Sequence, residues 1–239
     1  MLLTLDRGNS TLDAMLHGDG QRRQRLDPAA TLQPFLGASK PARCIGVTVV
    51  PDGLAAVERE LRASGVLLLL VGRDLQCPLP LDYETPATLG ADRWLGALAA
   101  HREFGRAVVV DCGSATTVSM IEQDGTFRGG AIAPGLRALL AGMQAVTPHL
   151  PAADPARAVA LPARSSAASV HTGAMLAFCG AVERLCADAL AAMRGPATVV
   201  LTGGHADDYL RHGRLRPVLR GDLVHCGLAI LGEGAPCIC

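Results

Sequence analysis

The sequence has no excess of charge of either sign. Its 22 Lys and Arg residues are balanced by 22 Asp and Glu residues, so the formal net charge at pH 7 is 0, and the chain has no basic run. Proteins that bind nucleic acids or anionic membranes electrostatically carry a basic surface. We therefore expect neither a nucleic acid nor a membrane as a partner.

Long hydrophobic runs are also missing. The longest, from Val66 to Val71, is far too short to cross a bilayer, which takes about 20 residues. The N-terminus has no basic region ahead of its apolar residues, and Asp6 interrupts these residues early, so no targeting signal is expected. Together these absences predict a cytoplasmic protein.

Cysteine is present, but not in the arrangement of a metal site. The 8 cysteines fall mostly within expected strands and helices and lack paired metal-ligand spacing. Cys237 and Cys239 at the C-terminus could bind a metal or oxidise, but the sequence favours a frayed tail with free thiols. With 49% hydrophobic and 18% charged residues in 239, the chain is globular, as one large domain or two similar lobes.

What the sequence does contain is an apolar run that ends at an acid and a glycine turn. The run Ala107–Val110 is short and rich in β-branched residues, as in a buried strand. It ends at Asp111, and the turn 112–117 that follows carries several hydroxyls before a second strand leaves through Val118 and Met120. Such a turn offers N–H and hydroxyl donors to an anion and a carboxylate to a cation, as a phosphate with its metal requires.

The same pattern occurs elsewhere in the chain. The apolar residues 2–5 run into Asp6 and Gly8, and the apolar residues 198–201 lead into a glycine turn at 202–206. One acid–glycine turn would be weak evidence, because ordinary hairpins contain it too. Its repetition predicts an internal duplication whose halves face each other across a nucleotide.

Hydrophobic periodicity predicts an α/β chain. The expected strands lie at 1–6, 11–17, 43–50, 66–72, 107–110, 118–120, 129–134, 197–202 and 217–225. The expected helices lie at 54–63, 92–104, 136–146, 167–193 and 206–212. A proline-containing loop at 77–89 has the character of a functional segment, and a linker covers 147–164. The helix 167–193 has an apolar surface broad enough for both the core and a partner subunit.

A candidate general base follows from the chemistry of phosphoryl transfer, which needs a phosphate grip, a metal and a carboxylate to accept the proton of the attacking hydroxyl. We favour Asp92, where a loop becomes a helix. Gly90 allows close approach of a substrate, and Arg93 can pair with a carboxylate or a developing charge. Asp is also a preferred helix N-cap, and spacing alone leaves that alternative open.

Six segments of the chain form a combined pattern: DRGNST (6–11), Tyr83 followed by LGADR (89–93), DCGSATT (111–117), GGAIAPGL (129–136), TGGHA (202–206) and LVHCGL (223–228). Together, in this order and spacing and over nearly the whole chain, they resemble type III pantothenate kinase. The resemblance implies the acetate-kinase, sugar-kinase, Hsp70 and actin fold, with two ribonuclease-H-like lobes of mixed sheets flanked by helices and ATP between them. We expect the lobes at 1–104 and 105–239.

The resemblance further implies transfer of the γ-phosphate of ATP, with Mg²⁺, to the hydroxyl of pantothenate, the first step of coenzyme A synthesis. The enzyme would be a homodimer that needs a monovalent cation, potassium or ammonium. Asp92 matches the family's catalytic base and Asp111 its monovalent-cation ligand. Positions that match pantothenate-binding residues are Tyr83, Gly90, Ala91, Arg93 and, across the dimer, Ser166. Positions that match nucleotide-binding residues are Asp6, Gly8, Asn9, Ser10, Ser114, Gly203 and Gly204.

Two of these matches have ordinary structural alternatives, since Tyr83 could be a half-buried loop aromatic and Ser166 a plain helix cap. Arg7 stands where the family prefers a small or apolar residue. Asp13 stands where many members place a lysine near the phosphates, and Ser119 where an aspartate is usual. The usual threonines are replaced, with the hydroxyl kept, by Ser10, Ser114 and Ser166.

Asp13 reduces positive charge near ATP, and Ser119 reduces acidic charge near the cation. The departures at Arg7, Asp13 and Ser119 put nucleotide affinity and cation dependence in question more than the fold. They leave two alternatives open beside an active pantothenate kinase. One is a homologue that has lost catalysis and acts as a binding or regulatory protein. The other is a kinase of the same fold that acts on another small hydroxylated acid.

Overall fold

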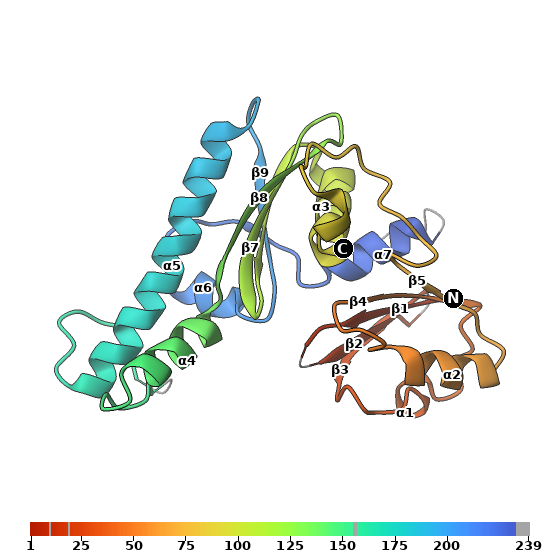
Figure 1. The fold of residues 1–239 in the computed structure, drawn as a ribbon, viewed down its shortest axis with the longest axis horizontal. Helices are drawn as coiled ribbons and strands as arrows, with labels where there is room; N and C mark the ends of the chain where they lie inside the picture. Colours follow the sequence, from red (N-terminus) through yellow and green to blue (C-terminus); the bar gives the residue numbers. More distant parts are fainter. Residues whose placement is uncertain (10, 19, 155–156, 233–239) are drawn as a thin grey trace. The chain divides into compact units, whose positions relative to one another are not determined.

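The computed structural model describes the chain except residues 10, 19, 155–156 and 233–239 (Figure 1). The described residues form two compact units. Unit 1 comprises Met1–Leu79, Glu84–Ala99 and the chain from Asp222, and unit 2 comprises Pro80–Tyr83 and Ala100–Gly221. The contacts thus divide the chain at other points than the single boundary expected after residue 104. Cys237 and Cys239 lie outside the described residues.

Unit 1 is built on a five-stranded sheet of order β3-β2-β1-β4-β5. Its strands are β1 (Leu2–Arg7), β2 (Leu12–His17), β3 (Arg22–Leu26), β4 (Arg43–Thr48) and β5 (Leu68–Leu70). Its helical segments are α1 (Gln33–Leu36), α2 (Ala55–Ala63), η1 (Pro86–Thr88), α7 (Leu223–Leu231) and the first part of α3 (Ala91–Phe104), which continues into unit 2 from Ala100.

The two faces of this first sheet are covered by different helices. Leu3 and Leu5 of β1 point to one face, where they share a buried core with Phe35 of α1 and with Val57 and Leu61 of α2. Figure 1 shows α1 and α2 together on this face. Successive side chains in a strand point to opposite faces, so Thr4 points to the other face, where α7 packs on β1 and β4.

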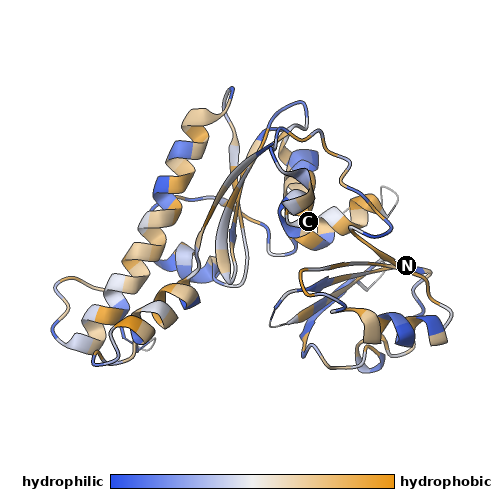
Figure 2. Cartoon of the chain, viewed as in Figure 1, coloured by the Kyte–Doolittle hydropathy of each residue, from blue (hydrophilic) through white to orange (hydrophobic). Residues whose placement is uncertain are grey.

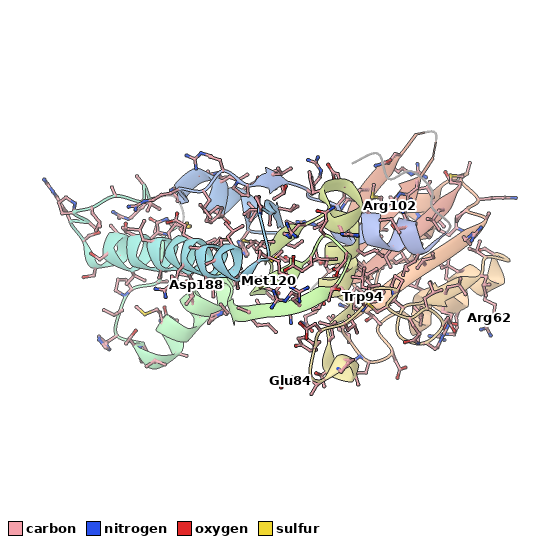
Figure 3. The ribbon with its side chains drawn as sticks, turned by 90° about the horizontal axis from the view of Figure 1, so that it is seen from above. Arg62, Glu84, Trp94, Arg102, Met120 and Asp188 are labelled. Carbon is pink, nitrogen blue, oxygen red and sulfur yellow. The ribbon has the colours of Figure 1, made fainter. Side chains whose placement is uncertain are left out.

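Unit 2 is built on a second five-stranded sheet, of order β10-β9-β6-β7-β8. Its strands are β6 (Ala107–Cys112), β7 (Ala115–Ile121), β8 (Phe127–Pro134), β9 (Thr198–Thr202) and β10 (Val218–Leu219), and its further helices are α4 (Leu136–Val146), α5 (Ser166–Ala192) and α6 (Ala206–His212). The long helix α5 places Phe178 and Val182 against Val108 and Val110 of β6 in a buried core. On its exposed face α5 carries solvated charges such as Asp188, labelled in Figure 3.

The two sheets have the same topology. In each, the first strand pairs antiparallel with the second and parallel with the fourth, and the third and fifth strands form the edges. Strands β1 to β5 therefore correspond in order to β6 to β10. This correspondence bears out the expected duplication and places β1 and β6, the strands before the two acid–glycine turns, in equivalent central positions.

One expected strand is wrong. Of residues 217–225 only Val218 and Leu219 form a strand, and the helix α7 begins at Leu223. This helix is buried on nearly every side, so its sequence is apolar without a helical period, and a short apolar run does not distinguish a strand from a buried helix. Figure 2 shows α7 mostly in the hydrophobic colour, whereas α2 mixes both colours.

The sequence also left two elements of unit 1 unassigned. The strand β3 has the sequence RRQRL and is largely exposed, so it lacks the hydrophobic alternation that marks a strand. It forms because its backbone pairs with β2 at the edge of the sheet. The helix α1 is a single turn, too short for a periodic pattern. None of the helices in the described part of the chain is long and apolar enough to span a membrane.

Candidate functional site

The glycine turn of unit 2 begins where Asp111 ends the buried part of β6. In the sheet register Asp111 lies opposite Thr117 of β7 and Thr202 of β9, so its carboxylate shares one face with a hydroxyl on each neighbouring strand. Thr202 is buried, and Thr117 is partly buried. Carboxylate and hydroxyl oxygens are the donors that hard cations prefer in proteins.

The turn after β9 packs directly on this acid. Gly203 has a φ of +96°, and a side chain there would overlap the Asp111 carboxylate and the backbone of Cys112. The His205 amide donates a hydrogen bond to the Cys112 carbonyl, 2.9 Å away. Gly203 is therefore required both for its backbone conformation and for the close approach of the two turns. Two sequence motifs about 90 residues apart thus meet at one place.

A third segment meets them from β8. A Cβ built on Gly135 would lie 2.5 Å from the carbonyl oxygens of both Gly113 and Ser114. Strands β6, β8 and β9 run in the same direction, so their carboxyl ends lie at the same edge of the sheet. Ser114 and Gly204 are exposed at this edge. The edge therefore combines accessible hydroxyl and amide donors with one carboxylate, which suits an anion accompanied by a cation.

The donor set at this edge bears on the kind of cation it could hold. Among the described residues there is no group of three or more His, Cys, Asp or Glu side chains able to bind a metal. Asp111 would therefore act with neutral oxygens, which fits a monovalent cation or a Mg²⁺ ion that keeps most of its water. Ser119 is buried on the same face as Asp111, and its hydroxyl adds no charge there.

The corresponding turn of unit 1 follows β1. Asp6 is partly buried near the end of the strand, the Gly8 amide donates a hydrogen bond of 3.1 Å to the Thr11 carbonyl, and Asn9 is exposed. Ser10, expected to bind nucleotide, lies outside the described residues. Two buried nitrogens of Arg7, Nε and Nη1, have no hydrogen-bond partner within the part of the chain that is described. A buried donor without a partner is costly, so Arg7 offers a cation to an anion near this turn.

Asp13 lies directly opposite Asp6 on the neighbouring strand and forms ion pairs with two arginines. Its carboxylate accepts hydrogen bonds from Nε and Nη2 of Arg23, at 3.0 Å and 2.6 Å, and from Nε of Arg25 at 3.4 Å. Burial works against ionisation, but His225 and Arg23 hold the pKa of Asp13 well below its usual value. Asp13 stands where many family members place a lysine, so the sequence predicted less positive charge near the phosphates. Arg23 and Arg25 offset that difference, and neither of them was identified from the sequence.

The segment with the candidate base is also in unit 1. The helix α3 begins at Ala91, so the position before it belongs to Gly90, and Asp92 is the second helical residue. Asp92 Oδ1 accepts a hydrogen bond from the amide of its neighbour Arg93, 2.9 Å away. An N-cap side chain instead accepts from an amide two or three residues ahead. Asp92 is thus not the helix cap that spacing alone allowed.

Two neighbours shape the surroundings of Asp92. A Cβ on Gly90 would lie 2.6 Å from Asp92 Oδ1, so only glycine leaves the carboxylate in place. Arg93 is buried, at 8% exposure, and Ala91 is partly buried. Trp94, labelled in Figure 3, is buried in the same turn and anchors the start of α3.

Tyr83 belongs to unit 2 and lies away from the glycine turns of that unit. Its ring packs edge-on against Phe127, with ring centroids 6.1 Å apart, and contacts Gly129. The backbone of this loop is held by hydrogen bonds between Asp82 and Phe127 and between Phe127 and Pro80. Tyr83 therefore lies at the start of β8, whereas the glycine turns of unit 2 lie at the opposite end of that strand.

Ser166 opens α5, but it does not cap the helix. The N-cap is Ser165, whose hydroxyl accepts a hydrogen bond from the Ala168 amide at 3.3 Å. Ser166 is the first helical residue, and its side chain is exposed. The capping alternative for Ser166 is thus wrong by one residue, because the neighbouring serine takes that role.

The expected site residues therefore fall into groups. Unit 2 brings together Asp111, Ser114, Gly203 and Gly204 at one sheet edge, with Tyr83 and Ser166 elsewhere in the unit. Unit 1 carries the turn of Asp6, Gly8 and Asn9 and the segment Gly90–Arg93. The residues that sequence reasoning missed are Arg23 and Arg25, whose spacing of two residues on one strand was the available signal.

Comparison with known proteins adds to this geometry. Residues 2–188 match the family model described as type III pantothenate kinase. A type III pantothenate kinase of Rhizorhabdus wittichii is 30% identical over 97% of both chains. One from Geobacter sulfurreducens is 32% identical over 57% of this chain and 60% of the relative.

Solved structures show the same fold at lower identity. A structure titled as a conserved putative Baf family transcriptional activator from Campylobacter jejuni covers 96% of both chains with a TM-score of 0.62 and 19% identity. A ROK family glucokinase from Streptomyces griseus covers 96% of this chain and 98% of its own, with a TM-score of 0.54 and 11% identity. These likenesses confirm the expected α/β fold of the sugar-kinase class, with two mixed sheets flanked by helices.

Proposed function

Since this chain belongs to the type III pantothenate kinase family, we propose that it catalyses the ATP-dependent phosphorylation of pantothenate to 4'-phosphopantothenate, the first step of coenzyme A biosynthesis. The observation that carries the proposal is the position of Asp92. Its carboxylate lies in the first turn of α3 without capping the helix, in space that Gly90 leaves open.

In the proposed reaction the hydroxyl oxygen of pantothenate attacks the γ-phosphorus of ATP while Asp92 accepts the hydroxyl proton. The bond between the γ-phosphorus and the bridging oxygen breaks, and ADP leaves. Such transfers depend on positioning and on stabilising charge more than on covalent catalysis. The first turn of a helix is a favourable place for a carboxylate, because the N-terminal end of the helix dipole is positive.

Nucleotide binding is assigned to the two acid–glycine turns. We propose that Asp6, Gly8, Asn9 and Ser10 contact the phosphates from unit 1. From unit 2 the contacts would come from Ser114, Gly203 and Gly204. Asp111 would hold the monovalent cation, potassium or ammonium, with help from the hydroxyls on its face. Mg²⁺ bound with ATP would neutralise the phosphate charge as it develops.

Pantothenate is a small carboxylic acid, and its proposed contacts match that chemistry. Gly90 and Ala91 would let it approach the backbone, and Arg93 would attract its carboxylate. Tyr83 would line the pocket, and Ser166 would reach a substrate bound to the partner subunit.

A homodimer is proposed because apolar side chains remain exposed on α4 and α5. Val146 of α4 is 81% exposed and Leu176 of α5 is 40% exposed. Large exposed apolar patches mark surfaces that bind another protein chain. The reaction consumes ATP and makes a coenzyme precursor, in keeping with the cytoplasmic location that the sequence predicts.

The proposal is tested by a coupled assay of ADP release with and without pantothenate, in potassium and in sodium buffer. Release that requires pantothenate, with 4'-phosphopantothenate identified as the product and higher rates in potassium, is the expected result. ADP release that does not depend on pantothenate would contradict the proposal. A panel of small hydroxylated acids tests whether pantothenate is the preferred acceptor.

The alternative of a binding or regulatory protein rests on Arg7, Asp13 and Ser119. At position 119 a hydroxyl stands where the family usually has an aspartate. Calorimetry separates it from the kinase, because a regulatory homologue would bind pantothenate and ATP without turning either over. Formation of 4'-phosphopantothenate would exclude this alternative.

A further inference from the structure

Four charged side chains share one face of the first three strands of unit 1. Asp6 lies opposite Asp13, and Asp13 lies opposite Arg25. Arg23 is two residues from Arg25 on β3 and therefore points to the same face. This face is continuous with the glycine turn that follows β1, since Asp6 is two residues before Gly8.

Asp13 packs against α7. It is 7% exposed, and its Oδ1 lies 3.4 Å from Nε2 of His225, a residue that is 1% exposed. The other ring nitrogen of His225 is 2.8 Å from the Thr4 hydroxyl. The Asp13 carboxylate thus lies within the packed interior of the unit.

Arg23 is the group that Asp13 orients. Its Nε lies 3.0 Å and 3.1 Å from the two carboxylate oxygens, and its Nη2 lies 2.6 Å from Oδ2. The Arg23 side chain remains 30% exposed, so solvent and solutes reach part of it. Arg25 contacts Asp13 only at 3.4 Å and is 57% exposed, so Asp13 orients it less closely than Arg23.

The two arginines offset the acids of this face. Asp6 and Asp13 carry two negative charges and Arg23 and Arg25 two positive charges, so an acid at position 13 does not leave the face beside the turn negative. A guanidinium is planar and binds phosphate through two parallel hydrogen bonds. A side chain already held in one geometry also loses less entropy when it binds.

We propose that Arg23 binds a phosphate group of ATP at the first glycine turn, with Asp13 as the positioning residue that orients its guanidinium. The inference rests on the proposed function in that ATP is the phosphoryl donor. The phosphate-binding guanidinium is thus placed on β3, an edge strand. Charged residues on such a strand ordinarily serve only to keep the edge of the sheet in solvent.

The test compares ATP with adenosine, which lacks the phosphates, in calorimetric titrations of the full chain. Arg23→Gln is expected to weaken ATP binding about tenfold and to leave adenosine binding unchanged. Arg22→Gln is the matched control. Arg22 is on the same strand, but it points to the opposite face, where it donates to the Leu36 carbonyl and stacks on Phe35. This control should bind ATP as the wild type does.

A rescue experiment tests the role of charge directly. In Asp13→Lys/Arg23→Gln a lysine replaces the carboxylate, and ATP affinity should return to within about threefold of the wild type. Asp13→Asn should weaken ATP binding severalfold because Arg23 loses its anchor, while adenosine binding is kept.

Unchanged ATP affinity in Arg23→Gln would overturn the inference, and so would an equal loss of ATP and adenosine binding. Both results are independent of turnover. If the wild type binds ATP but does not phosphorylate pantothenate, the proposed function fails, whereas the comparison of Arg23 and Arg22 variants still decides the inference.

Discussion

A side chain at position 90 and the carboxylate of Asp92 compete for the same space, since a Cβ on Gly90 would lie 2.6 Å from Asp92 Oδ1. The backbone of Gly90 is not in the left-handed region, so alanine is allowed there by conformation. The conflict is therefore with the carboxylate alone, which can rotate away.

Gly90→Ala is expected to lower kcat at least tenfold while changing the melting temperature little. The added methyl displaces the proposed base, and positional errors of about 1 Å cost large factors in rate. Steady-state kinetics and thermal unfolding measure the two effects. Gly142→Ala on α4, where a Cβ meets nothing within 4 Å, is the control and should keep full activity. Normal turnover in Gly90→Ala would contradict the role assigned to Asp92.

Asp92→Asn is expected to reduce turnover roughly a hundredfold or more, as for loss of a general base. The fold should be unaffected, because an amide oxygen can still accept the hydrogen bond from the Arg93 amide. Rates of 4'-phosphopantothenate formation and circular dichroism check both statements. The assignment fails if this variant turns over as fast as the wild type.

Gly203→Ala is expected to destabilise unit 2 by about 2 kcal/mol or more. The residue has a φ of +96°, and the new methyl would overlap the Cys112 backbone, which cannot rotate away as a side chain can. Urea unfolding followed by circular dichroism measures the loss. Gly180→Ala in α5, where a Cβ meets nothing within 4 Å, should be neutral or stabilising. Equal stability of the two variants would show that the turns are not in close contact.

The stability of unit 1 should fall as the solution is acidified from pH 6.5 to pH 4. Burial lowers the pKa of His17 from 6.5 to about 4, so in this range the unfolded chain binds a proton that the folded chain does not. The pKa of Asp13 is lowered as well, so its contribution to stability is lost at still lower pH. Free energies of unfolding measured in urea at pH 7, 5.5 and 4.5 should decrease in that order.

His17→Gln provides the control for this pH dependence. Without the histidine the decrease between pH 6.5 and 4 should become smaller, whereas the decrease at lower pH, due to Asp13, should remain. An unchanged slope in the variant would mean that other groups cause the acid sensitivity.

Several parts of this structure could be predicted from the sequence because they depend on local patterns. The strand β6 with its acid–glycine turn, the helix α5 and the helix α4 each carry a period or turn signal within a few residues. The repetition of the turn predicted the duplication, and the combined motifs predicted the family. The motif around Asp92 was equally visible, although spacing alone did not separate a base from a helix cap.

Other parts were decided only by tertiary structure, because they depend on neighbours that are distant in the sequence. The strand β3 exists through its pairing with β2, and α7 is a helix because it is buried against β1 and β4. Gly135 and Gly203 meet the turn at Asp111 from β8 and β9. By itself, the sequence determined the type of fold, the duplication and the family. Tertiary structure decided which charges meet, as in the pairing of Asp13 with Arg23, since only strand register places them side by side.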